Sequence, residues 1–179
     1  LLKPIDCTFT ERRLDLYPHQ RLLFSEVKYE DPVPIFRRNA EATKIDTNAV
    51  VIALSGISHP EEFFAYVERG FSRVVTLPYA DHHHYSRRNV TTWENILTDY
   101  LARGVEVVFL CTDKDAVKVF ELESYMSSEL RERFLRLPIQ VRFKSHGEEN
   151  LRKLVLEHIA QFTRTQAQEE EHKEEEEKE

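Results

Sequence analysis

The run of reactive side chains from Tyr79 to Tyr85, which reads YADHHHY, is the most informative stretch of this sequence. An aspartate beside a histidine can orient the imidazole ring, fix its tautomer and stabilise its protonated form. Such a pair is suited to proton transfer near neutral pH. Metal binding and capping of the loop are the competing uses of these residues. Carboxylate and cysteine ligands are missing at suitable spacing, so we predict no built-in metal site.

A second polar stretch, Ser55–Pro60, follows a run of β-branched and aliphatic residues. Gly56 lets the backbone turn tightly, and the first amides of the helix expected after it can bind an anion. Ser55 and Gly56 are therefore candidates for cofactor binding. An ordinary strand-to-helix turn would explain the same residues, because neither a GxGxxG nor a Walker A pattern is present.

A third polar stretch, Thr112–Lys118, reads TDKDAVK and also follows an apolar run. Thr112 can cap the helix that begins there, and the acidic residues suit its first turn. Lys114 could reach a phosphate group. We take Thr112, Lys114 and Asp115 as further candidates for cofactor binding, although capping alone would explain Thr112.

Three apolar runs precede these loops, and each is followed by a segment of helical periodicity. The runs are Val50–Leu54, Arg73–Leu77 and Val105–Leu110. Alternating strands and helices of this length predict an α/β domain with a Rossmann-like, doubly wound, mainly parallel sheet and flanking helices. The ligand crevice of such a sheet lies beyond the carboxyl ends of its strands, so the three polar loops should meet there. The alternating run Ile139–Phe143 is expected at a half-exposed edge.

Helix starts are indicated by S/T-x-x-E patterns, in which the hydroxyl and the carboxylate bind amides of the first turn. The patterns are Ser58–Glu61, Thr91–Glu94 and Ser145–Glu148. Gly70 and Gly104 fit the position just after a helix. A closing helix is expected around residues 151–162, with one apolar face.

Short β-type runs open the chain at Arg12–Tyr17, Leu22–Tyr29 and Val33–Phe36. They predict a small antiparallel β linker, which needs a partner surface because an isolated hairpin buries too little. We therefore expect a β-ribbon linker over residues 1–45, an α/β domain over 46–166 and a disordered acidic tail over 167–179. The first residue is Leu, and we expect the chain to be part of a longer protein.

The formal net charge of −7 comes mostly from the last eleven residues, which carry eight Glu and two Lys. The remainder is nearly neutral, which argues against a nucleic-acid partner. Two distant cysteines suit a reducing compartment, without a disulfide framework. No apolar run reaches the roughly 20 residues of a membrane span, so the chain itself is expected to be soluble.

Taken in order, the three loops resemble motifs in the C-terminal half of the tetraacyldisaccharide 4'-kinases. The matching positions are Gly56, Ile57, Pro60, Phe63, Phe64, Asp81, His82, His83, Tyr85, Thr112, Lys114, Asp115, Ala116, Val117 and Lys118. The segment Tyr17–Gln20, with Phe24 and Tyr29, is similar to the strand linker of that family. The likeness covers roughly residues 10–165, and Ala80 and Asp113 depart from it.

The resemblance implies transfer of the γ-phosphate of ATP, with Mg²⁺, to the 4'-hydroxyl of tetraacyldisaccharide 1-phosphate. This is a step of lipid A biosynthesis at the cytoplasmic face of the inner membrane of Gram-negative bacteria. The family's P-loop, magnesium-binding acids and catalytic aspartate lie in its N-terminal half, which would bind most of the ATP and Mg²⁺. The resemblance implies that His82 supports that aspartate, with Asp81 as its neighbour, and that this chain alone is inactive.

Two other functions fit parts of the sequence. Asp81, His82 and His83 spell the motif of DHH-type phosphoesterases, but that chemistry needs further aspartates at strand ends to hold two metals. The first and third strands end in Ser55 and Thr112 instead. The other alternative is a Rossmann-like nucleotide-binding or interaction module without enzymatic activity, whose histidines merely cap.

Overall fold

A computed structural model of the chain describes residues 4–18, 20–37 and 40–176, with side chains described over 7–18, 20–37 and 40–163. This part of the chain divides into two compact units. Unit 1 comprises Leu1–Lys28 and Val141–Glu179, and unit 2 comprises Tyr29–Gln140. The division differs from the expected bounds, since it groups residues 29–45 with the sheet and residues 141–166 with the N-terminal segment.

Unit 2 is built on a sheet with the strand order β2-β6-β5-β3-β4. Its strands are β2 (Val33–Pro34), β3 (Val50–Ser55), β4 (Val74–Pro78), β5 (Val107–Thr112) and β6 (Phe134–Leu137). Strand β3 runs parallel to β4 and β5, and β5 runs parallel to β6, whereas β2 pairs with β6 in the antiparallel sense. The predicted α/β class with a mainly parallel sheet is confirmed.

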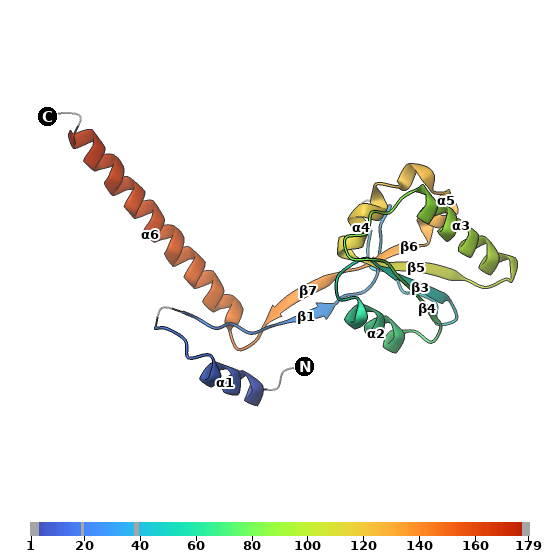
Figure 1. The fold of residues 1–179 in the computed structure, drawn as a ribbon, viewed down its shortest axis with the longest axis horizontal. Coiled ribbons are helices and arrows are strands. Elements are labelled where there is room, and N and C mark those ends of the chain that lie inside the picture. Colours follow the sequence, from blue (N-terminus) through green and yellow to red (C-terminus); the bar gives the residue numbers. More distant parts are fainter. Residues whose placement is uncertain (1–3, 19, 38–39, 177–179) are drawn as a thin grey trace. The chain divides into compact units, whose positions relative to one another are not determined.

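Helices cover both faces of this sheet (Figure 1). They are α2 (Glu61–Gly70), α3 (Arg87–Ala102), α4 (Asp113–Phe120) and α5 (Ser128–Glu132), with a 3₁₀ turn at Glu123–Tyr125. Alternate residues of a strand face opposite sides of a sheet. Accordingly Ile52 of β3 lies in a cluster with buried residues of α3, α4 and α5, while Val51 lies in a second cluster with Phe63 and Val67 of α2.

The sequence prediction for the opening segment was wrong in two respects. Arg12 belongs to helix α1 (Pro4–Arg13), and the rest of the expected strand Arg12–Tyr17 is not a strand. The short strands of this region also do not pair with one another, since β2 joins the main sheet and β1 (Ser25–Tyr29) pairs with β7 (Ile139–Phe143). Strand edges need hydrogen-bond partners, and here the partners come from distant parts of the sequence.

The pairing of β1 with β7 also corrects the expected place of Ile139–Phe143, which is not an edge of the main sheet. The Glu30 amide donates to the Pro138 carbonyl at 2.9 Å, and the Lys144 amide donates to the Phe24 carbonyl at 2.8 Å. Residue numbers therefore rise along one strand as they fall along the other, so the ribbon is antiparallel.

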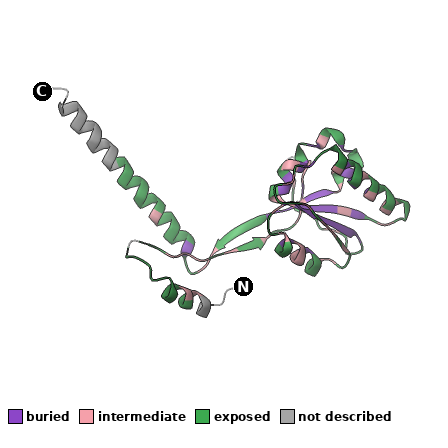
Figure 2. Ribbon diagram, in the orientation of Figure 1, coloured by how far each residue is buried: buried purple, intermediate pink, exposed green. Residues whose placement is uncertain are grey.

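Most described residues of helix α6 (Gly147–Glu176) of unit 1 are exposed, with Gly147 buried and Leu154 half-buried, whereas the buried residues of unit 2 gather on its strands (Figure 2). Apolar residues of the expected helix face are among these exposed side chains: Leu151, Val155, Ile159 and Phe162. The α6 backbone continues through residues 167–176, for which we predicted disorder, and residues 177–179 lie outside the described residues. Within the described chain, no helix combines the length and apolar character that a membrane span requires.

The predicted start of α3 was wrong, whereas the glycine predicted to follow its end was correct. The helix begins at Arg87 after Ser86, rather than at Thr91, and the Asn89 side chain accepts a hydrogen bond from the Ser86 amide at 2.8 Å. Asparagine thus replaces the expected glutamate of the capping pattern. At the other end, Gly104 follows the helix with a φ of 70°, a left-handed conformation that favours glycine.

Replacing Gly104 with alanine should lower the free energy of unfolding by about 1 kcal/mol, because a Cβ atom disfavours positive φ. A Cβ at Gly104 would meet nothing within 4 Å, so the effect isolates the backbone conformation. Urea denaturation of the chain measures it. Gly70→Ala is the matched control, since that helical position is equally open and has no positive φ. Equal losses from both substitutions would contradict this explanation.

Candidate active site

The three polar loops meet at the carboxyl ends of strands β3, β4 and β5, as predicted. Strand β3 lies between β4 and β5, so the direction of strand succession reverses at β3, where open α/β sheets place their ligand crevice. The Tyr79 amide after β4 donates to the Ser55 carbonyl at the end of β3 at 2.8 Å. The Gly56 amide after β3 donates to the carboxylate of Asp115 after β5 at 3.1 Å.

Asp115 is the centre of this junction, and its side chain is completely buried. Besides the Gly56 amide, it accepts hydrogen bonds from three hydroxyls: Ser55 Oγ at 3.2 Å, Tyr85 Oη at 3.1 Å and Thr112 Oγ1 at 2.7 Å. Asp115 forms no ion pair with any described residue. Hydrogen-bond donors and its place in the first turn of α4 therefore compensate the cost of burying its charge.

This geometry changes the interpretation of the predicted cofactor-binding residues. Ser55, Gly56 and Asp115 are buried and bonded to one another, so they form the scaffold of the site rather than its surface. Thr112 caps α4, since its hydroxyl accepts a hydrogen bond from the Asp115 amide at 3.2 Å. Of these five candidates, Lys114 alone has an exposed side chain.

Close packing explains why position 56 is a glycine. A Cβ atom built there would lie 3.1 Å from His83 Cβ, 3.3 Å from Asp115 Oδ1 and 3.3 Å from Tyr85 Oη. These separations are shorter than ordinary van der Waals contact, so any larger residue would displace the loop that follows β4.

His82 is an exposed reactive group at these strand ends, and Asp81 lies beside its imidazole ring. The His82 side chain is 76% exposed, and its Nε2 atom lies 3.6 Å from Asp81 Oδ2. The His82 backbone has a φ of 57°, in the left-handed region. Its amide donates to Asp81 Oδ1 at 2.9 Å and to the Gly56 carbonyl at 3.2 Å. Asp81 thus contacts both the ring and the backbone of its neighbour.

The next two histidines have different surroundings. His83 stacks on Tyr79 with ring centroids 4.6 Å apart, and it meets the edge of Tyr85 at 4.9 Å. Its Nε2 atom is buried and has no hydrogen-bond partner within the described chain. His84 is exposed. His82 is therefore the histidine that combines exposure with an adjacent carboxylate. Among the described residues, no three His, Cys, Asp or Glu side chains gather as a metal site would require.

Burial controls the protonation of two groups beside Asp115. Burial, and then the charge of Asp115, raise the pKa of Tyr85 far above its ordinary value, so its hydroxyl remains a donor. Burial also raises the pKa of the Cys111 thiol well above its ordinary value. A buried neutral thiol is a poor nucleophile, so Cys111 belongs to the core and not to the chemistry.

Sequence reasoning did not foresee that Trp93 and Lys118 form hydrogen bonds with the histidine loop. Trp93 of α3 donates from Nε1 to Tyr79 Oη at 3.0 Å, and Lys118 of α4 donates from Nζ to the His83 carbonyl at 2.9 Å. The aromatic residues at both ends of YADHHHY were the available signal, because buried tyrosine and tryptophan need polar partners.

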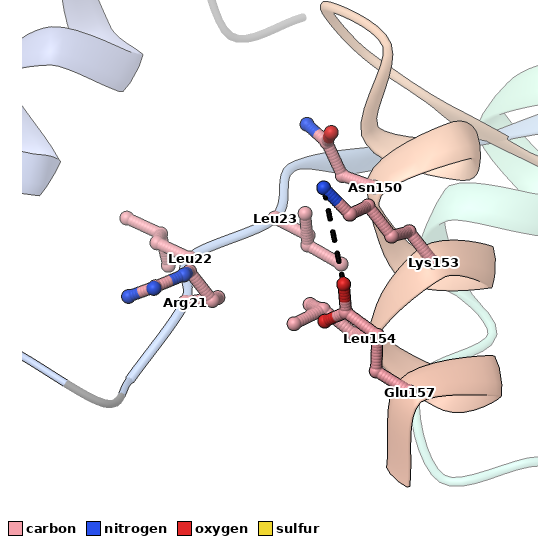
Figure 3. A pocket seen from close by; sticks show the side chains of 7 residues that line it. All are labelled: Arg21, Leu22, Leu23, Asn150, Lys153, Leu154 and Glu157. Atoms are coloured by element: carbon pink, nitrogen blue, oxygen red, sulfur yellow. Dashed lines mark ion pairs between the residues drawn. The ribbon is translucent and has the colours of Figure 1, made fainter. Parts of the chain in front are cut away.

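A separate cavity of about 340 Å³ lies in unit 1. Figure 3 shows the residues that line it, of which Arg21, Leu22 and Leu23 come from the segment before β1, and Asn150, Lys153, Leu154 and Glu157 come from α6. Lys153 and Glu157 form an ion pair at 3.8 Å. None of the predicted site residues lines this cavity, so the candidate active site remains the edge of the sheet in unit 2.

The pattern of this site agrees with a known family. Residues 10–160 match the model of the family described as tetraacyldisaccharide-1-P 4'-kinase. The chain belongs to this family. The match confirms the resemblance drawn from the three loops, and it favours the kinase family over the DHH-type phosphoesterases.

Relatives in the family share modest sequence identity with the chain. A tetraacyldisaccharide 4'-kinase of Porphyromonas gingivalis is 30% identical over 142 residues, which are 79% of this chain and 39% of that protein. The enzyme of Bacteroides thetaiotaomicron is 25% identical over 172 residues, covering 91% of this chain and 44% of that protein. The chain thus spans about two fifths of the length of these relatives.

A solved structure shows a weaker likeness. The crystal structure of Aquifex aeolicus LpxK in complex with ATP has 19% sequence identity and a TM-score of 0.44 with this chain. The alignment covers 80% of this chain and 38% of the Aquifex protein.

Proposed function

We propose that this chain is the C-terminal part of a kinase of lipid A biosynthesis. The complete protein transfers the γ-phosphate of ATP to the 4'-hydroxyl of tetraacyldisaccharide 1-phosphate. The family match over residues 10–160 carries this proposal. The preceding part of the protein, a P-loop domain, binds most of the nucleotide, and the protein acts at the cytoplasmic face of the inner membrane.

The role proposed for His82 is to support the catalytic aspartate of the P-loop part. Asp81, with Oδ2 3.6 Å from His82 Nε2, lies beside the ring and can orient it. An exposed imidazole can donate a hydrogen bond from a ring nitrogen to a carboxylate across a cleft, which a buried one cannot. Lys114, exposed in the first turn of α4, is the candidate cation for a phosphate of the bound nucleotide.

The acidic residues at this edge do not fit a magnesium site. Asp115 is enclosed by protein donors, and Asp81 is engaged by the backbone and ring of His82. Mg²⁺ prefers several oxygen ligands and waters in octahedral geometry. We therefore assign Mg²⁺ to the P-loop part and derive no step through it here.

Phosphoryl transfer gains most from positioning and from electrostatic stabilisation of the transferred group. A second part of the protein that closes over the nucleotide supplies both, and it excludes water from the reaction. Unit 2 suits that role, because its sheet positions the polar loops at the carboxyl ends of its strands.

The proposal is tested on the protein comprising this chain and the segment that precedes it in the gene. Purified protein, radiolabelled ATP and tetraacyldisaccharide 1-phosphate in detergent should yield the labelled 4'-phosphorylated lipid, separated by thin-layer chromatography. A truncated protein that ends before this chain should transfer no label. Equal transfer by the truncated protein would contradict the proposal.

The chain alone should bind Mg-ATP no more tightly than about 1 mM, which corresponds to about 4 kcal/mol. The physical reason is the absence of a Gly-rich phosphate cradle from the printed sequence. Isothermal titration calorimetry of the 179-residue chain measures this affinity. Stoichiometric binding in the micromolar range would show that the nucleotide site does not depend on the P-loop part.

A further inference from the structure

We propose that Asp115 is a positioning residue for His82. Its buried carboxylate binds the Gly56 amide and the Tyr85 hydroxyl, and these two groups hold the loop that presents the His82 imidazole. The inference rests on the proposed function, because it assumes that His82 supports catalysis. It gives Asp115 a role that requires no contact with ATP or lipid.

The first connection runs through Gly56. The Gly56 amide donates to both carboxylate oxygens of Asp115, at 3.2 and 3.1 Å. The carbonyl of the same glycine accepts the His82 amide at 3.2 Å. Asp115 therefore holds the amide of Gly56, and the carbonyl of Gly56 in turn holds the His82 backbone.

The second connection holds the far end of the loop. Tyr85 Oη donates to Asp115 Oδ1 at 3.1 Å, and the Tyr85 ring packs edge-on against His83. One helical turn further along α4, Lys118 Nζ donates to the His83 carbonyl at 2.9 Å. Helix α4 thus contacts the chain that follows His82 at two points, His83 through Lys118 and Tyr85 through Asp115.

The conformation of His82 makes it sensitive to these contacts. A non-glycine residue in the left-handed region is strained, so surrounding interactions must hold it there. His82 has a φ of 57°, and the Gly56 carbonyl is one of two acceptors for its amide. If Gly56 shifts, the loop can relax toward ordinary φ and carry the imidazole away from its place.

The number of donors around the side chain explains why a carboxylate is needed. An ionised carboxylate only accepts hydrogen bonds, whereas an asparagine amide accepts at one atom and donates at the other. In Asp115→Asn, the NH₂ group replaces one of the two carboxylate oxygens, and each of these oxygens accepts from the Gly56 amide and from at least one hydroxyl. The substitution keeps the shape of the side chain and disturbs the contacts that set the loop.

The test uses the protein that contains this chain and its preceding segment. Asp115→Asn should lower kcat for lipid phosphorylation about 10- to 100-fold, the size expected when a catalytic group is misplaced by about 1 Å. The KM for ATP should change little. Asp113→Asn is the matched control: it removes the same charge from the same turn of α4, but Asp113 pairs with Arg136 and should retain near-normal kcat.

A double-mutant cycle separates positioning from a merely structural role. If Asp115 acts through His82, then Asp115→Asn should have little further effect on kcat once His82 is alanine. A general structural defect would lower kcat by the same factor in both backgrounds, which would overturn the inference. Hydrogen exchange of the segment 79–86 should be faster in Asp115→Asn, and unchanged exchange together with a lowered kcat would also overturn it.

The outcomes distinguish this inference from the proposed function. If His82→Ala abolishes turnover while folded Asp115→Asn retains it, the positioning role is wrong and the proposed function stands. Normal turnover in His82→Ala overturns the role of His82, and the positioning role with it. If Asp115→Asn does not fold, Tyr85→Phe replaces it, because it keeps the ring and removes one donor to Asp115. Its smaller loss of kcat should likewise vanish in the His82→Ala background, and a persistent loss would contradict the inference.

Discussion

Replacing His82 with alanine in the protein that contains this chain and its preceding segment should lower kcat by about 10²- to 10⁴-fold, the usual contribution of a positioned acid–base group. An interaction made in the transition state affects kcat, whereas uniform ground-state binding affects KM. The KM values for ATP and lipid should therefore change far less. Steady-state phosphorylation of tetraacyldisaccharide 1-phosphate measures both constants.

The adjacent histidine provides the control for this experiment. His84 is also exposed, but no hydrogen bond or ion pair to Asp81 is found for it in the described chain. His84→Ala should therefore retain near-normal kcat. Loss of turnover in His84→Ala, or normal turnover in a folded His82→Ala protein, would assign the catalytic role to another residue and leave His82 a capping role.

Replacing Trp93 with alanine should lower the free energy of unfolding by about 3–5 kcal/mol, the range for a large aromatic residue in a well-packed core. Trp93 is completely buried, and its ring lies 5.1 Å from that of Phe134 and 5.5 Å from that of Tyr85. The substitution also removes the donor to Tyr79 Oη. Urea unfolding should be followed by circular dichroism, because the chain contains a single tryptophan.

Two variants give reference values for the loss of stability at Trp93, one for its hydrogen bond and one for a surface substitution. Tyr79→Phe removes the acceptor of the indole hydrogen bond and should cost about 1 kcal/mol. Val117→Ala changes a side chain that is 67% exposed, and surface changes of this kind stay within about 0.5 kcal/mol. A Trp93→Ala loss no larger than that of Tyr79→Phe would show that the core collapses around the missing ring.

Three strands were predictable because each is a run of β-branched and aliphatic residues, and β3 and most of β5 are buried on both faces. The runs at Val50–Leu54, Arg73–Leu77 and Val105–Leu110 fall on β3, β4 and β5. Strand β6 was missed, although Phe134 and Leu135 are both buried, because four residues before a proline carry little periodicity. The partner of β7 could not be foreseen, since strand pairing between distant segments leaves no local pattern.

The place of the site followed from topology, but the roles of its residues did not. Parallel strands bring their carboxyl ends to one edge, so the meeting of Gly56, His82 and Asp115 could be predicted. The sequence could not show which carboxylate is exposed. Asp81 and Asp115 are the same residue type, each a few residues after a strand, and tertiary packing buries Asp115 and leaves Asp81 exposed.

Because β1 pairs with β7, the segment Tyr29–Gln140 resembles a domain inserted into another chain. The polypeptide enters this unit at Tyr29 and leaves at Gln140, and next to these ends the Glu30 amide donates to the Pro138 carbonyl at 2.9 Å. Domains whose ends are adjacent can be gained, lost or exchanged by recombination, because a short bridge restores the host chain. Recombination can therefore exchange this inserted segment as one block. The two flanking segments, which are distant in sequence, would still fold together as unit 1.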